Sequence, residues 1–203
     1  MTSWEEFRRS VTIPGRGPGR YFRPATDTDL DDFEKHAGIP LPRGYREFTK
    51  VFGACELGPL GVLIAKPRRE RKRKSSSPTD LTWFADKMHK MVEASTVQIR
   101  GEAYAVDPAQ SLRLVFFASD SFGDSYGWDP EDVSNLADHE YAVYSRYHDD
   151  CPYLRRASSF EEFVLDFCLG ESLMRWREAG CPVGENSLDY KSGEDPRLYI
   201  SPR

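Results

Sequence analysis

A compact apolar run from Leu112 to Ala118 predicts a central β-strand in the middle of the chain. Turn-forming residues occupy positions 119–125, and Tyr126-Gly127-Trp128 then resumes the strand pattern. Gly123 and Gly127 flank this turn, where the absence of a Cβ atom permits positive φ angles. We therefore expect two neighbouring strands joined by a tight turn, the beginning of an antiparallel sheet.

Helical periodicity is present on both sides of this strand pair. Thr26 is placed to cap a helix that Gly38 closes, and Ser158, with Glu161 three residues later, matches the capping box of a C-terminal helix. The apolar stripes of the expected helices are Trp4, Phe7 and Val11; Leu30, Phe33 and Ala37; Tyr45, Phe48 and Phe52; Leu81, Phe84, Met88, Met91 and Val92; and Phe160, Phe163, Val164 and Phe167.

Further short strands are expected at 62–64, 97–99, 104–106 and 141–144. Because strands do not alternate regularly with helices, the order predicts one α+β domain, in which a mainly antiparallel central sheet packs against N-terminal and C-terminal helices. The expected parts are an N-terminal helix with a Gly/Pro-rich connector at 1–24, the domain at 25–170 with a mobile basic insertion at 66–78, and a C-terminal extension at 171–203, which we expect to be irregular from Gly180 onward.

The composition excludes several classes of protein. No stretch approaches the roughly 20 apolar residues of a membrane span. The start of the chain lacks a positively charged segment followed by an apolar core, so it does not match a secretory signal. The spacing of the cysteines fits neither a zinc site nor a disulfide framework; they are Cys55, Cys151, Cys168 and Cys181. We expect a cytoplasmic protein with reduced cysteines and no cofactor.

The charge is unevenly distributed. The chain has a net charge of −5, but the run from Lys66 to Lys74 contains seven basic residues and one acidic residue. Without this run the net charge is −11, so the body of the protein is distinctly acidic. Such a body repels nucleic acid phosphates and attracts a basic protein. We therefore expect a protein partner and no specific binding of nucleic acid.

The acidic residues are dense between positions 117 and 150, where the net charge is −8 over 34 residues and aromatic residues are interleaved. Two interpretations stay open: solvated turns above core aromatics, or a binding face with aromatic anchors and an acidic rim that steers a basic partner. The second interpretation gives the candidate partner-binding residues Asp120, Asp124, Tyr126, Trp128, Asp129, His148, Asp149 and Asp150.

No constellation of catalytic residues stands out. His148 beside Asp149 and Asp150 resembles a ligand cluster, but adjacent residues of a strand point to opposite faces, which disfavours a metal site. The Gly/Pro-rich stretch at 14–19 lacks the Gly-Lys-Ser/Thr that a phosphate-binding loop requires. We therefore expect no catalytic residues, no metal and no enzymatic activity.

Four segments in order resemble the SUKH superfamily. They are Ala37-Gly38-Ile39-Pro40-Leu41-Pro42 with Tyr45, Phe48 and Gly53; Leu114-Val115-Phe116-Phe117-Ala118 with Phe122-Gly123-Asp124-Ser125-Tyr126-Gly127-Trp128-Asp129; Tyr141-Ala142-Val143-Tyr144 with His148-Asp149; and Ala157-Ser158-Ser159-Phe160-Glu161-Glu162-Phe163-Val164. The insertion at 66–78 and the tail after Gly170 have no counterpart in the pattern.

This resemblance implies that the protein works by binding another protein. The superfamily includes immunity proteins of bacterial toxin systems and regulators of fungal cell-wall synthesis. It therefore implies an immunity protein that binds and blocks a toxin domain, commonly a nuclease, or alternatively a regulatory adaptor that binds a cellular protein. A basic toxin domain would suit the acidic body of this chain.

Overall fold

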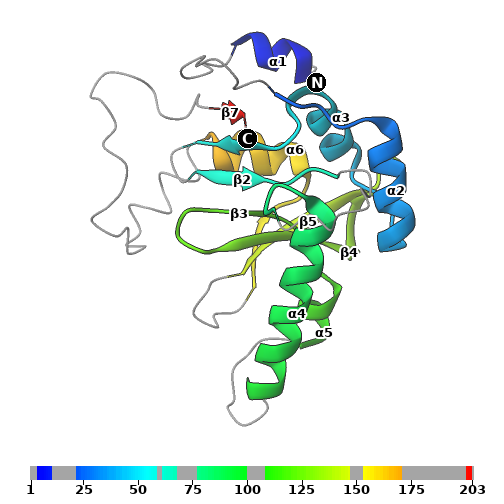
Figure 1. The fold of residues 1–203 in the computed structure, drawn as a ribbon, viewed down its shortest axis with the longest axis vertical. Helices are drawn as coiled ribbons and strands as arrows, with labels where there is room; N and C mark the ends of the chain where they lie inside the picture. The colour runs from blue at the N-terminus through cyan, green and yellow to red at the C-terminus, as the bar shows by residue number, and fades with distance from the viewer. Residues whose placement is uncertain are drawn as a thin grey trace.

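The computed structural model describes residues 4–10, 22–58, 61–67, 77–99, 108–146, 153–170 and 200–202. Its strands form one seven-stranded sheet in the order β6-β5-β4-β3-β2-β1-β7, and each neighbouring pair is antiparallel (Figure 1). The predicted α+β fold with an antiparallel sheet is confirmed. The helices are α1 (Trp4–Ser10), α2 (Asp27–Ala37), α3 (Arg43–Phe52), α4 (Leu81–Ile99), α5 (Pro108–Arg113), α6 (Phe160–Glu162) and the π-helix η1 (Phe163–Cys168). The strands are β1 (Cys55–Leu57), β2 (Val62–Ile64), β3 (Val115–Ser119), β4 (Ser125–Asn135), β5 (Glu140–Arg146), β6 (Leu154–Ala157) and β7 (Ile200–Pro202).

Local signals set the ends of α2 and α3. Thr26 and Asp29 form a reciprocal capping box at the start of α2, and Gly38 ends the helix with a φ of 71°. Gly53 ends α3 with a φ of 67°, and a Cβ atom there would lie only 2.0 Å from the carbonyl oxygen of Arg23. A glycine is therefore required here for two reasons: the backbone has a positive φ, and the segment at Arg23, which pairs with Gly53, leaves no room for a side chain.

Strand β3 divides the core between the two faces of the sheet. Phe117 packs on one face against Phe160 and Phe163, whose ring centroids lie 5.6 and 5.4 Å away. Phe116 points to the other face, where its ring lies 6.4 Å from that of His89 on α4. Helices α3, α6 and η1 thus cover one face, and α4 packs on the other and extends away from the sheet with α5 beside it (Figure 1).

The apolar run at 112–118 is not one strand. Helix α5 ends at Arg113 and β3 begins at Val115, which leaves the side chain of Leu112 43% exposed. The strand predicted at 97–99 is also wrong, because α4 continues through Ile99. The strand predicted at 104–106 lies outside the described residues.

The structure adds strands that the sequence pattern did not indicate. Strands β1, β6 and β7 have only three or four residues each, and β7 pairs Ile200 with Leu57 of β1. The expectation of an irregular tail is therefore wrong for residues 200–202. Strand β4 is also longer than predicted and contains Gly127 in its interior, across from Phe116.

Two more expectations need correction. The cap of α6 is Ser159, whose hydroxyl accepts a hydrogen bond from the N–H of Glu162, so the capping pair is shifted by one residue from the predicted one. Lys66, assigned to the basic insertion, is buried, and its Nζ donates to the carbonyl oxygen of Pro24 at 3.0 Å. Positions 68–76 of that insertion lie outside the described residues.

Candidate protein-binding surface

Five of the eight predicted binding residues are buried. Asp120 serves the β3–β4 turn: one carboxylate oxygen accepts hydrogen bonds from the N–H groups of Phe122 and Asp124, and the other accepts the hydroxyl of Tyr126 at 2.8 Å. Burial, and then the nearby charge of Asp124, raise the pKa of Asp120, while these hydrogen bonds act in the opposite direction. The role of Asp120 is to hold the turn.

Trp128 and Asp129 are also interior residues. The indole of Trp128 is fully buried and stacks on Phe117, with ring centroids 4.6 Å apart. Asp129 is 2% exposed, and its carboxylate lies 3.2 Å from the guanidinium of Arg113. Neither side chain can touch a partner in the folded protein. The remaining buried members of the predicted set are Asp120, Asp124 and Tyr126.

The prediction of an exposed corner formed by these five side chains is therefore wrong, because each completes the turn or the core. His148, Asp149 and Asp150 lie outside the described residues, so a binding role for them stays a prediction. Within positions 117–146, the carboxylates that reach the surface are those of Glu131, Asp132 and Asp138, in the β4–β5 hairpin.

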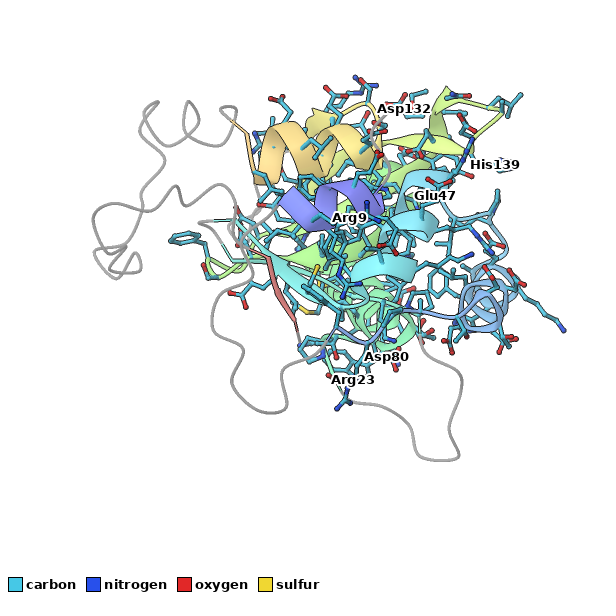
Figure 2. All side chains as sticks on the ribbon, turned by 90° about the horizontal axis from the view of Figure 1, so that it is seen from above. Arg9, Arg23, Glu47, Asp80, Asp132 and His139 are labelled. Atoms are coloured by element: carbon cyan, nitrogen blue, oxygen red, sulfur yellow. The ribbon has the colours of Figure 1, made fainter. Side chains whose placement is uncertain are left out.

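We define the hairpin corner as residues 131–140 of the β4–β5 hairpin, Arg43–Glu47 of α3 and Ser158–Glu161 at the start of α6. Figure 2 shows Glu47, Asp132 and His139 toward the same end of the molecule, while Asp80 and Arg23 lie at the other. The sequence places these three segments far apart, and the fold brings them together because the hairpin ends beside the N-terminal ends of both helices.

Glu140 joins these segments from the inside. Its carboxylate accepts hydrogen bonds from the backbone N–H of Gly44 at 2.7 Å and from that of Phe160 at 3.1 Å. Burial raises the pKa of Glu140, and the two backbone hydrogen bonds oppose this shift. Pro42, which precedes α3, provides no side-chain cap. A carboxylate from β5 therefore accepts hydrogen bonds from the first turns of two helices: it replaces the missing side-chain cap of α3 and adds to the Ser159 cap of α6.

Arg43 fastens the hairpin to α3 on the outer side. Its backbone N–H donates to the carbonyl oxygen of Asp138 at 3.0 Å, and its guanidinium donates to the Asp138 carboxylate at 2.9 Å. The same guanidinium lies 2.8 Å from Glu47 one turn along the helix. These contacts fix the position of the turn relative to the helix.

A cleft of about 350 Å³ opens at this corner. Its charged side chains are Arg43 with the carboxylates of Glu47, Asp138, Glu140 and Glu161, and it is completed by Trp4, Gly44, Ser134, Asn135, Ser158 and Ser159. Carboxylates outnumber the single arginine, so the cleft favours a cationic group. A second hollow of about 410 Å³ continues past Arg43 and Asp138 to Asp31, Glu34 and His139.

The turn of the hairpin also exposes an apolar side chain that the sequence reasoning did not single out. Leu136 is 76% exposed, and Val133 on the preceding strand is 41% exposed. The available signal was the position of a leucine in the turn sequence Asn135-Leu136-Ala137-Asp138-His139, which has no other large apolar residue. An apolar residue in such a turn has no core to enter.

The described residues contain no group of three or more His, Cys, Asp or Glu side chains arranged to hold a metal ion. Cys55 and Cys168 are free thiols in the core, where burial raises the pKa of both. Within the same part of the chain, no helix is long and apolar enough to cross a membrane. Cys151 and Cys181 lie outside it.

The comparisons with known proteins agree with the fold. The model of the SMI1 / KNR4 family (SUKH-1) matches residues 24–166 of the chain. The search of curated proteins found no match to the chain. The matched region includes α2, α3, the sheet from β1 to β6 and the first residues of η1, and it contains the whole hairpin corner. Trp4 on α1, which also lines the cleft, lies outside the matched region. The chain belongs to the SMI1 / KNR4 family (SUKH-1).

Proposed function

We propose that this protein is an immunity protein, which binds a basic toxin domain in the cytoplasm of a bacterium and blocks it. Membership of the SUKH-1 family supports a protein-interaction role for the domain. The observation that carries the proposal is the acidic cleft at the hairpin corner, which is lined by Glu47, Asp138 and Glu161 together with Arg43. A nuclease toxin binds phosphates and is therefore often basic, so an acidic surface is suited to occupy its active site.

The mode of action is occlusion. A blocking protein needs a rigid scaffold and a complementary surface of roughly 800 Å² on each partner. The scaffold is supplied by the antiparallel sheet with helices on both faces, and the corner is held by the hydrogen bonds of Glu140 and Arg43. The protein requires no catalytic group for this task.

The experiment is coexpression with the toxin. The C-terminal domain of a secreted toxin encoded beside this gene is produced in a host, with and without the present protein. We expect growth to be restored by coexpression, and the two proteins to elute as one complex in size-exclusion chromatography. Continued growth arrest, without a complex, would contradict the proposal.

The alternative is a regulatory adaptor, which the resemblance to the fungal regulators favours. In that case no toxin gene lies beside this gene, and the tagged protein retains a cellular protein whose loss does not poison the host. The genomic neighbourhood and the identity of the retained protein therefore separate the two functions.

A further inference from the structure

We infer that Leu136, at the tip of the β4–β5 hairpin, is the apolar anchor of the partner interface and enters an apolar pocket with a basic rim on the partner protein. This inference rests on the proposed function and names the contact through which it acts. Of the large hydrophobic side chains whose exposure the structure describes, Leu136 is the most exposed, at 76%. Val133, three residues earlier on β4, is 41% exposed.

The turn uses its polar groups internally and presents its apolar group outward. The side-chain oxygen of Asn135 accepts hydrogen bonds from the N–H groups of Ala137 and Asp138, at 3.0 and 3.4 Å. The amide nitrogen of Asn135 donates to the Asp138 carboxylate at 3.1 Å. His139 closes the turn with a φ of 50° and donates its N–H to the carbonyl oxygen of Leu136.

The tip is also fixed from outside by Arg43, which contacts both the backbone and the carboxylate of Asp138. A backbone held in such a rigid turn loses little conformational entropy when it binds. The turn is therefore preorganised to present Leu136 to a pocket.

Charge identifies the kind of partner. The carboxylates of Glu131 and Asp132 precede the tip on β4, and the acidic cleft begins at Asp138 just after it. The side chain of Glu131 is 70% exposed. An apolar tip between carboxylates matches a pocket whose rim carries Lys or Arg, since the unlike charges set the orientation and the apolar contact excludes water. We assign the occupant of this surface as a basic protein.

The test uses the full chain in its native host. A photoreactive benzoylphenylalanine replaces Leu136 in one variant and Leu154 in a control variant. Leu154 is 40% exposed on β6, where it pairs with Ser145 at the end of β5 away from the turn. Affinity capture on the unmodified tagged chain identifies the retained protein independently. We expect the retained protein to have a basic surface. On illumination it should be cross-linked to the variant with the photoreactive residue at position 136 and not to the variant with it at position 154.

Binding constants complete the test. With the retained protein in purified form, Leu136→Ser should raise the dissociation constant by about tenfold or more. The dissociation constants of Leu136→Met and Leu154→Ser should stay within about twofold of that of the unmodified chain. Because Leu136 is exposed, the melting temperature of Leu136→Ser should be unchanged. Unchanged affinity of Leu136→Ser, or cross-linking from position 154 alone, would overturn the inference and leave the proposed function intact. Retention of no basic protein by the unmodified chain would overturn both.

Discussion

The carboxylate of Glu140 accepts a hydrogen bond of 2.7 Å from the backbone N–H of Gly44, the second residue of α3. A Cβ atom at position 44 would lie 3.1 Å from the same oxygen, so a glycine allows this close approach. Because the other oxygen of Glu140 accepts from Phe160, one side chain of the sheet orients both helices that border the acidic cleft. The shape of the candidate binding surface therefore depends on a buried charge.

Glu140→Gln should lower the free energy of unfolding by about 1–3 kcal/mol at neutral pH. The glutamine amide has one oxygen, so one of the two N–H groups at Gly44 and Phe160 loses its acceptor and faces an NH₂ group. Chemical denaturation measures the change. Glu131→Gln is the matched control, because Glu131 is 70% exposed and loses only a surface ion pair with Arg113, which should change stability by less than about 1 kcal/mol. Equal effects of the two substitutions would contradict the capping role of Glu140.

Asp120→Asn should remove a pH-dependent contribution to stability. The folded protein raises the pKa of Asp120 above its ordinary value of 3.8, so the folded state binds its proton more tightly than the unfolded state. The contribution is present in full below pH 3.8 and is lost as the pH rises through the raised pKa. The stability of the natural protein relative to Asp120→Asn should therefore fall from pH 4 toward neutrality.

Denaturation of both proteins across this pH series provides the measurement. Taking the difference between them cancels the titration of groups that they share. Asparagine can still accept the N–H groups of Phe122 and Asp124 with its oxygen, and its NH₂ can donate to Tyr126, so the turn is retained. A difference that does not vary with pH, or that grows in favour of the natural protein as the pH rises, would show that the pKa is not raised.

The glycines that end α2 and α3 should respond differently to alanine. Both have a positive φ, but a Cβ atom at Gly38 meets nothing within 4 Å, whereas one at Gly53 would clash with the carbonyl of Arg23. Gly38→Ala should cost about 1–2 kcal/mol for the left-handed backbone alone. Gly53→Ala should cost more than about 3 kcal/mol, since overpacking adds to strain. Thermal unfolding of the two variants decides the point, and a similar loss in both would count against the observed packing.

Replacement of residues 68–76 by a Gly/Ser segment of equal length should change the free energy of unfolding by less than about 0.5 kcal/mol. The described ends of this insertion are tied together, because Leu81 donates its N–H to the carbonyl of Lys66, whose own N–H donates to Thr79. Lys66→Ala is the contrasting variant and should cost about 1–3 kcal/mol through loss of the buried hydrogen bond to Pro24. Cooperative loss of the fold in the replaced chain would refute the prediction.

Local sequence signals were sufficient for α2 and α3, because the cap at Thr26 and the glycines at 38 and 53 act within one turn of chain. Local signals were insufficient where contacts with distant segments determine the secondary structure. The residues 97–99 have the side chains of a strand, yet they continue α4. Strand β7 exists only through its pairing with β1, far away in the sequence.

The candidate site shows the same division. Acidic composition between positions 117 and 150 was visible in the sequence, but composition cannot distinguish an exposed carboxylate from one that holds a turn. The carboxylate of Asp120 accepts hydrogen bonds from N–H groups two to four residues later, as aspartates in turns often do. Asp129, in contrast, forms an ion pair with Arg113, sixteen residues away in the sequence. The meeting of the hairpin with two helix N-termini needed the three-dimensional structure.

The most direct measurement is the association rate with the toxin domain as a function of salt concentration. Glu47→Gln, Asp138→Asn and Glu161→Gln together remove three carboxylates from the cleft, and Asp86→Asn, Glu93→Gln and Asp166→Asn remove three from α4 and η1 as a control with the same net charge. Both folded variants are compared with the natural protein by stopped-flow kinetics. The cleft variant should associate about tenfold more slowly at low salt, with a flatter salt dependence, while the control stays much closer to the natural protein. Equal rates and salt slopes for the two variants would contradict binding through the hairpin corner.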